Sequence, residues 1–383
     1  MTCRVSLRFN VSPAFVAALT ILTAFTPVAG RGDADLERSV GMMTRIAFCG
    51  SPVFSPDGTR LAFISNISGV PQVWTVDARG GWPTQVTALE DPVGGVDWSP
   101  DGAWLAVSVA PGGGMNSQIH LVRPDGTGMK RLTGGGRDNN WLGGFSHDGR
   151  LLTLSSNRDN PQAMDAFVYE LSADRLRLVA RNPGVGTLED ISRDGRWGIL
   201  SRVRSRGDND LFLVDLHTGS ETLLTPHDPP GSFGGGTFSP DGAILYLTSN
   251  KGRDRTALSR IRMDEKGRPG PIETIAGRDD AEVQEFSIDD DGGSAAVVWN
   301  AAGRSELHFV DLSTLASRPA PALPAEIVYG LDLSRDGRLL AMTVSGAASP
   351  ADVWVLDRAA GEIRRITTSP HAGVDLASLV RPE

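Results

Sequence analysis

The stretch "FSPDGTRLAFIS" (residues 54–65) joins a tight turn to a short apolar strand, and the chain repeats it. In such a turn proline presets φ, aspartate accepts hydrogen bonds and glycine supplies a positive φ. Copies of the turn occupy residues 54–58, 98–102, 145–149, 191–195, 238–242, 286–292 and 333–337. Their glycines lie 44 to 50 residues apart, and such a steady period predicts a repeat architecture. We interpret the longer copy, "FSIDDDG" (286–292), as the same turn with an inserted residue.

Each turn belongs to a unit of the same plan. A short apolar stretch precedes the turn, and an apolar strand follows it. A polar loop then leads to a third strand such as "VWTVD" (residues 73–77), and a weak strand such as "RRIT" (residues 364–367) ends the unit. Four short antiparallel strands per unit are typical of a propeller blade. The sequence therefore predicts an all-β protein, a seven-bladed β-propeller of four-stranded antiparallel blades.

The first and last units indicate how the ring closes. The first contains its own inner strand, "CGSPVF" (residues 49–54), and its own outer strand, "TQVT" (residues 84–87). The last runs from "IVYGLDL" (residues 327–333) to its own outer strand. No strand is left over to complete another blade, so we expect closure by packing of blade one on blade seven, without a shared Velcro strand.

The chain ends lie outside the repeats. Two arginines, an apolar run of 12 residues (14–25) and small residues before Gly30 have the pattern of a secretory signal peptide. The run is shorter than a membrane span of about 20 residues. We predict a signal peptide over residues 1–30, cleaved near Gly30, and a periplasmic or secreted protein with no membrane span after cleavage; a retained anchor is the alternative. Residues 31–48 would then form a lead-in segment, residues 49–368 the propeller and residues 369–383 a linker-like tail.

The composition and the motifs exclude several functions. The net charge of −9 argues against a nucleic-acid partner, which needs a basic surface. The two cysteines are Cys3 in the signal and Cys49, which we expect to be a buried apolar residue. The chain contains no Gly-x-Ser-x-Gly pentapeptide, no P-loop and no histidine pair at metal-ligand spacing. We therefore predict no catalytic residue, no metal and no cofactor, and leave open whether the protein is an enzyme.

Strand direction places the richest loops on one face of the ring. Loops that enter an inner strand and loops between second and third strands share this face, which we call the loop face. Binding residues commonly lie on loops held by a rigid scaffold, so we predict that a peptide or protein ligand binds here; a solvated, charge-balanced rim is the alternative. The candidate residues are Arg137, Asp138, Asn140, Trp141, Arg158, Asp159, Arg206, Asp208, Arg253, Arg255 and Arg278.

The repeat has a family resemblance. "FSPDG-x-x-LAF" followed by "VWTVD" resembles the WD-like (PD40) repeat that TolB proteins share with the prolyl oligopeptidase family of serine peptidases. TolB proteins have six blades behind an α/β domain, whereas seven blades behind a short lead-in resemble the peptidases. The entry "ADLERSVGMMTRIAFCGSPVFSPDG" (residues 34–58) and the exit "LVRPE" (residues 379–383) are similar to those of the dipeptidyl-peptidase and acylaminoacyl-peptidase branch.

The resemblance implies two possible functions. In the peptidases an α/β-hydrolase domain carries the catalytic Ser, Asp and His, and the propeller filters substrates by size. No residue of this chain matches the triad, so we expect a non-catalytic, substrate-gating propeller of a split or truncated peptidase, with its hydrolase domain lost or encoded separately. The alternative is a free-standing TolB-like exported propeller that serves as a protein-protein interaction module.

Overall fold

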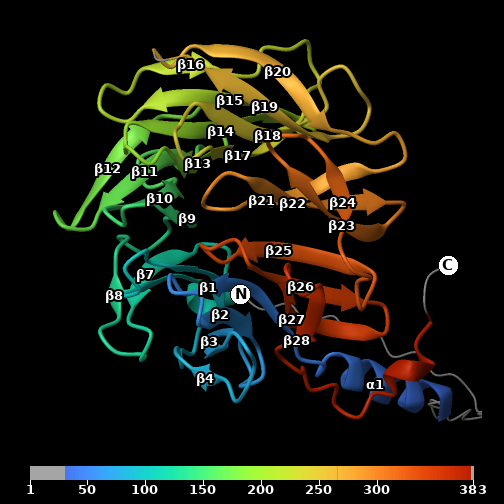
Figure 1. Cartoon of the computed structure of the whole chain (residues 1–383). Helices are drawn as coiled ribbons and strands as arrows, with labels where there is room; N and C mark the ends of the chain where they lie inside the picture. Colours follow the sequence, from blue (N-terminus) through green and yellow to red (C-terminus); the bar gives the residue numbers. More distant parts are fainter. Residues whose placement is uncertain (1–30, 265, 381–383) are drawn as a thin grey trace, which may run out of the picture. The chain divides into compact units, whose positions relative to one another are not determined.

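The computed structural model describes residues 31–264 and 266–380 (Figure 1). The predicted signal peptide, residues 1–30, lies outside the described residues. The chain divides into two units, residues 1–44 and residues 45–383. The first contains α1 (Arg31–Met43), a helix within the predicted lead-in segment. The second contains every described strand, with two short 3₁₀ turns at Pro111–Gly113 and Leu376–Ser378.

The described strands form seven four-stranded antiparallel sheets, which confirms the predicted all-β, seven-bladed propeller. Blade 1 holds β1 (Cys49–Phe54), β2 (Arg60–Ser65), β3 (Gln72–Asp77) and β4 (Thr84–Gln85); blade 2 holds β5 (Val93–Trp98), β6 (Leu105–Val109), β7 (Gln118–Val122) and β8 (Lys130–Arg131); blade 3 holds β9 (Asn140–Phe145), β10 (Leu151–Ser156), β11 (Asp165–Glu170) and β12 (Arg175–Ala180). Blade 4 holds β13 (Gly186–Ile191), β14 (Trp197–Ser205), β15 (Asp208–Asp215) and β16 (Glu221–Leu223); blade 5 holds β17 (Phe233–Phe238), β18 (Ile244–Ser249), β19 (Ala257–Met263) and β20 (Pro269–Ala276). Blade 6 holds β21 (Glu282–Ile288), β22 (Ser294–Ala301), β23 (Arg304–Asp311) and β24 (Ser317–Pro319); blade 7 holds β25 (Ile327–Leu333), β26 (Leu339–Gly346), β27 (Ser349–Asp357) and β28 (Glu362–Arg365).

The hydrophobic core lies between the blades. The described residues form seven apolar clusters, and each joins two neighbouring blades. One of them packs Phe54 and Phe63 of blade 1 against Val353 and Val355 of blade 7. Each sheet contains only its own consecutive strands, so the ring closes by packing without a shared strand, as predicted. Figure 1 shows the labelled first strands of the blades gathered around the middle of the ring.

The repeated turn has the structural role that its residues predict. In the first copy the Ser55 hydroxyl donates to an Asp57 carboxylate oxygen at 2.6 Å, and Gly58, with φ 68°, donates its N–H to the Ser55 carbonyl at 2.8 Å. Successive turns also touch. A Cβ on Gly292 would lie 2.6 Å from Cδ of Pro240 in the preceding blade, so glycine is required there for close approach as well as for its positive φ.

The structure corrects the interpretation of "FSIDDDG". Phe286 and Ser287 lie within β21, and the turn itself is the five-residue segment 288–292, with no inserted residue. Asp289 takes the place of the usual serine: its N–H donates to Ser294 O at 3.1 Å, and its carboxylate accepts from the Ser294 hydroxyl at 2.6 Å. The letters Phe-Ser occur by coincidence two residues early, and only the hydrogen-bond register shows which residues turn.

Carboxylates on the inner strands tie one blade to the next. In blades 2, 4 and 7 an aspartate directly precedes the turn motif and accepts the backbone N–H of the following blade: Asp97 from Phe145 at 2.9 Å, Asp190 from Phe238 at 2.8 Å and Asp332 from Phe54 at 2.6 Å. Burial raises the pKa of Asp97 and of Asp190 to about 6, although the N–H donors act in the opposite direction. Burial, with the neighbouring Asp97 charge, raises the pKa of Asp332 to about 7. The last of these bonds helps to close the ring.

Substitution of Asp332 tests this closure. Asp332→Asn keeps an acceptor for the Phe54 N–H, whereas Asp332→Ala leaves it unsatisfied and should lower the free energy of unfolding by about 1–3 kcal/mol. The folded pKa of Asp332, about 7, exceeds its ordinary value of 3.8. The protonated side chain therefore adds to the free energy of unfolding at low pH, and this contribution is lost as the pH rises through 7. The stability of the wild type relative to Asp332→Asn should therefore fall between about pH 4 and pH 7 in urea unfolding. An unchanged difference would contradict this account.

Candidate functional site

The chain enters and leaves the ring side by side on the loop face. The Ala47 N–H donates to the Pro370 carbonyl at 2.9 Å, just before β1 and just after β28. The Phe48 N–H donates at 2.9 Å to the side chain of Asn66, which begins the loop between β2 and β3. The strand directions therefore place both ends of the propeller on the face predicted to bind a ligand.

Some of the predicted binding residues lie exposed there. Arg137, Arg206 and Arg255 are exposed on three different loops. Arg158 and Asp159 are also exposed, with Nε and Oδ1 3.5 Å apart. These residues come from blades 3, 4 and 5 and the loops beside them, and the structure does not join them into one cluster.

Arg253 and Arg278 form a fixed contact between the loops of blades 5 and 6. Arg253 donates to the Arg278 carbonyl at 2.6 Å. The Arg278 guanidinium pairs with Asp280 at 2.8 Å and with Glu306, and it lies over the Trp299 ring. Hydrogen bonds to the two carboxylates raise the pKa of Arg278 above its ordinary value. This arginine is held by the protein's own acids.

Asn140 and Asp138 anchor loops. Asn140 is buried, and its amide donates to the Ser117 carbonyl at 3.0 Å and to the Gln118 side chain at 3.2 Å. The Asp138 carbonyl accepts from the Gln118 side chain at 2.8 Å. By contrast, Trp141, the next residue of β9, is 37% exposed. Of these neighbours, the tryptophan is the one with an accessible apolar surface.

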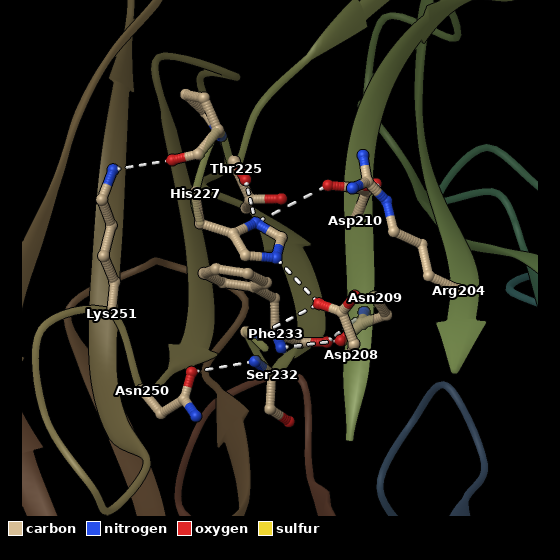
Figure 2. Close-up of polar contacts among 12 residues, drawn as sticks. Arg204, Asp208, Asn209, Asp210, Thr225, His227, Ser232, Phe233, Asn250 and Lys251 are labelled. Carbon is tan, nitrogen blue, oxygen red and sulfur yellow. Dashed lines mark hydrogen bonds and ion pairs between the residues drawn. The ribbon is translucent and has the colours of Figure 1, made fainter. Parts of the chain in front are cut away.

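Asp208 lies in a polar cluster of the loop face, shown in Figure 2. His227 Nε2 lies 2.9 Å from Asp208 Oδ1, and His227 Nδ1 lies 2.8 Å from the Thr225 carbonyl and 3.7 Å from Asp210 Oδ1. Arg204 pairs with the second oxygen of Asp210. His227, Asp208 and Asp210 are all buried, so Asp208 is not the surface residue that a ligand-binding role would require.

The cluster connects blades 4 and 5. Arg204 lies on β14 and the two aspartates on β15, whereas His227 lies in the loop from β16 to β17. The Phe233 ring, at the start of β17, packs on the His227 imidazole with centroids 4.9 Å apart. From blade 5, Lys251 Nζ donates to the Pro226 carbonyl at 2.9 Å (Figure 2). The loop that enters blade 5 is thus held from both sides.

The surroundings of His227 favour its protonated form. Each ring nitrogen of His227 faces an oxygen acceptor. Only the doubly protonated imidazolium can donate a hydrogen bond from both nitrogens. Burial alone would lower the pKa of His227, but the Thr225 carbonyl and the two aspartates outweigh it and raise the pKa. The His227 hydrogen bond, with that of the Gly231 N–H, lowers the pKa of Asp208. A histidine held in this way offers no free nitrogen for general base catalysis, so the cluster positions a loop.

A sequence signal for part of this cluster exists in the other blades. Asp210 directly precedes the apolar run of a third strand, as do Gln118 in blade 2 and Asp352 in blade 7. Those two side chains accept the hydroxyl of the threonine that ends their own blade, Thr133 and Thr367, each at 2.8 Å. The repeat therefore indicates a loop-holding role for Asp210. The partnership of Asp208 with His227, 19 residues away, has no such signal.

Other chemistry is not apparent in the described part of the chain. No group of three or more His, Cys, Asp or Glu residues there is arranged to hold a metal ion. None of the helices in residues 31–264 and 266–380 is long and apolar enough to cross a membrane. Cys49 is buried, as predicted, with Sγ 3.3 Å from the Ser65 hydroxyl.

The ring of seven four-stranded blades and its loop face define the class of protein, a β-propeller. The TolB beta propeller domain model (PD40) matches residues 32–268, and the chain belongs to this family. Dipeptidyl aminopeptidase BIII of Pseudoxanthomonas mexicana is 27% identical over 380 residues, which cover 92% of this chain and 53% of that protein. The uncharacterized peptidase YuxL of Bacillus subtilis is 29% identical over 219 residues, which cover 54% of this chain and 30% of that protein.

Solved structures agree with the fold. Prolyl oligopeptidase B from Galerina marginata superposes with a TM-score of 0.69 at 11% identity, covering 90% of this chain and 53% of that one. A prolyl endopeptidase superposes with a TM-score of 0.69 at 14% identity, covering 87% and 51%. The protein is thus a propeller that resembles the propeller domain of prolyl oligopeptidases and dipeptidyl peptidases. The chain spans about half the length of dipeptidyl aminopeptidase BIII and of these structures.

Removal of the His227 side chain tests the cluster. A histidine whose folded pKa exceeds its unfolded value of 6.5 stabilises the fold fully below pH 6.5, and this contribution is lost as the pH rises through the folded pKa. We expect His227→Ala to lower the free energy of unfolding by about 2 kcal/mol at pH 6 and by less at pH 9. His217→Ala, at an exposed position of the same blade, is the control and should change little. An equal loss for His227→Ala at both pH values would contradict a protonated imidazole.

Proposed function

We propose that this propeller is the substrate-selecting domain of a prolyl-oligopeptidase-like serine peptidase of the dipeptidyl-peptidase type. It acts on peptides together with an α/β-hydrolase domain that sits on the loop face, and it does so outside the cytoplasm. The observation that carries this proposal is the hydrogen bond between Ala47 and Pro370, which brings the entry and the exit of the ring together on that face. A domain joined to either end would emerge directly over the loops.

The relatives support a propeller that selects substrates and a separate hydrolase domain that carries out catalysis. The match to dipeptidyl aminopeptidase BIII runs along 92% of this chain but accounts for 53% of that protein. The described residues of this chain assemble no nucleophile, base and oxyanion donors at one point, and the buried His227 is already bonded at both nitrogens. Catalysis would therefore come from the hydrolase domain, and the propeller would supply the loops that a peptide meets before it reaches the active site.

The exposed residues of the loop face fit this role. Trp141 offers an aromatic surface, and Arg137, Arg206 and Arg255 offer exposed cations at three points around the face. The fixed contacts beneath them, above all the His227 cluster, hold the loops in place. A rigid rim with exposed aromatic and arginine side chains is suited to contact with a second domain or a peptide.

A second function is a free-standing, exported propeller that binds proteins. The match of residues 32–268 to the TolB beta propeller domain favours it. In this case the loop face would bind its ligand without a hydrolase domain.

Reconstitution with a hydrolase domain distinguishes the two functions. We expect the purified chain to remain unlabelled by a serine-directed fluorophosphonate probe. Co-expression with the α/β-hydrolase encoded in the same or an adjacent reading frame should yield a complex that cleaves dipeptidyl 4-nitroanilides. Arg206→Glu with Arg255→Glu, both on the loop face, should weaken the association about tenfold, because charge reversal at a rim acts against electrostatic complementarity.

The control is Arg150→Glu, at an exposed position beside the turn motif on the opposite face, which should leave the association unchanged. Labelling of the chain by the probe would contradict the non-catalytic assignment. Micromolar peptide or protein binding by the chain alone, together with failure to bind any hydrolase domain, would favour the TolB-like function.

A further inference from the structure

One position of the repeated turn varies in a systematic way. The residue after the serine is proline in blades 1, 2 and 5, where it only shapes the turn. In blade 7 this position holds Arg335, and in blades 3, 4 and 6 it holds His147, Arg193 and Asp290, once the turn of blade 6 is placed at residues 288–292. All three lie at the end of the ring opposite the loop face, which we call the turn end.

These three side chains meet although they belong to different blades. Arg193 Nη2 donates to Oδ1 of Asp290 at 3.1 Å and also to the Asp290 backbone carbonyl. His147 Nε2 lies 3.8 Å from the other carboxylate oxygen of Asp290. The contact joins blade 4 to blade 6 and passes over blade 5. It therefore links two blades that are not neighbours in the ring.

A cavity of about 220 Å³ lies directly beside this contact. Its lining includes Asp190 and Thr237, from the inner strands β13 and β17, together with His147, Arg193 and Asp290. The inner strands of a propeller surround a central channel, so this cavity lies at the turn end of the channel, on the side of blades 3 to 6. The side chains of Arg193 and Asp290 are 35% and 37% exposed, which places the pair between the cavity and solvent.

We propose that Arg193, Asp290 and His147 close the turn end of the central channel, so that a peptide enters and leaves this propeller only through the loop face. That a peptide is the molecule excluded rests on the function proposed above, whereas the closure itself does not. Passage through the turn end requires loss of charge-assisted hydrogen bonds between Arg193 and both the carboxylate and the carbonyl of Asp290. The three residues thereby determine the direction from which a substrate is selected.

Cysteine accessibility tests the closure without a peptide or a hydrolase. Thr237→Cys places a thiol in the cavity at the turn end, and Thr187→Cys places one near the loop-face end of β13. The background is the full chain with Cys3→Ser, because the native Cys49 is buried. The probe is a cationic methanethiosulfonate reagent, and the readout is the rate of modification by mass spectrometry.

We expect Arg193→Ala to increase the modification rate of Thr237→Cys about fivefold and to leave the rate of Thr187→Cys unchanged. The size of the increase is that expected for the loss of one partly exposed ion pair. Asp290→Ala should act in the same direction but less strongly, because it retains the backbone carbonyl that Arg193 also contacts. The control is Arg196→Ala, on the same face, whose partner Asp215 lies in its own blade.

Two results would overturn the proposal. Unchanged modification of Thr237→Cys in both Arg193→Ala and Asp290→Ala would show that the contact does not limit access. An equal increase at Thr187→Cys would show a general loosening of the ring. Circular dichroism melting of each variant verifies folding, and Asp290→Ala serves if Arg193→Ala does not fold. Failure of the hydrolase reconstitution would leave these rates unaffected, so the two proposals fail separately.

Discussion

Packing between neighbouring blades is the interaction on which this protein depends. A four-stranded blade has two faces, and each buries its apolar side chains only against the next blade, so the core consists of layers between sheets. The same requirement makes ring closure essential, since an open ring would leave the faces of blades 1 and 7 exposed. The Asp332 carboxylate and the cluster around Phe54 and Val355 satisfy it without a shared strand.

This architecture assigns different roles to the two ends of the ring. At the turn end, short turns of similar chemistry contact each other, and one of their variable positions holds His147, Arg193 and Asp290 in blades 3, 4 and 6. At the loop face, longer connections emerge, and many of the polar side chains there hold the loops in place. Asp208 and Asn140 belong to this supporting set, whereas Trp141 and the exposed arginines belong to the surface that a partner can reach.

The fold could be predicted in detail because its signal is local and repeated. Proline, aspartate and glycine in a turn act through their own backbone preferences, and the apolar strand beside each turn needs no distant partner to be recognised. The candidate site could be predicted only in part. Strand direction places the candidate loops on one face, as the structure has them, but the residues within these loops differ in burial. Nothing in "RGDND" (residues 206–210) distinguishes exposed Arg206 from buried Asp208, because the distinction depends on His227 in another loop.

The sequence by itself determined the number of blades, the chemistry of the turns, the face that carries the loops and the closure without a shared strand. Each of these follows from residues close together in the chain or from the count of strands. Only the tertiary structure decided the register of the blade 6 turn, the hydrogen-bond partners that raise the pKa of His227 and the contact between Arg193 and Asp290. These depend on which side chains the closed ring brings together, and residues 97 positions apart meet only because the blades curve around a common axis.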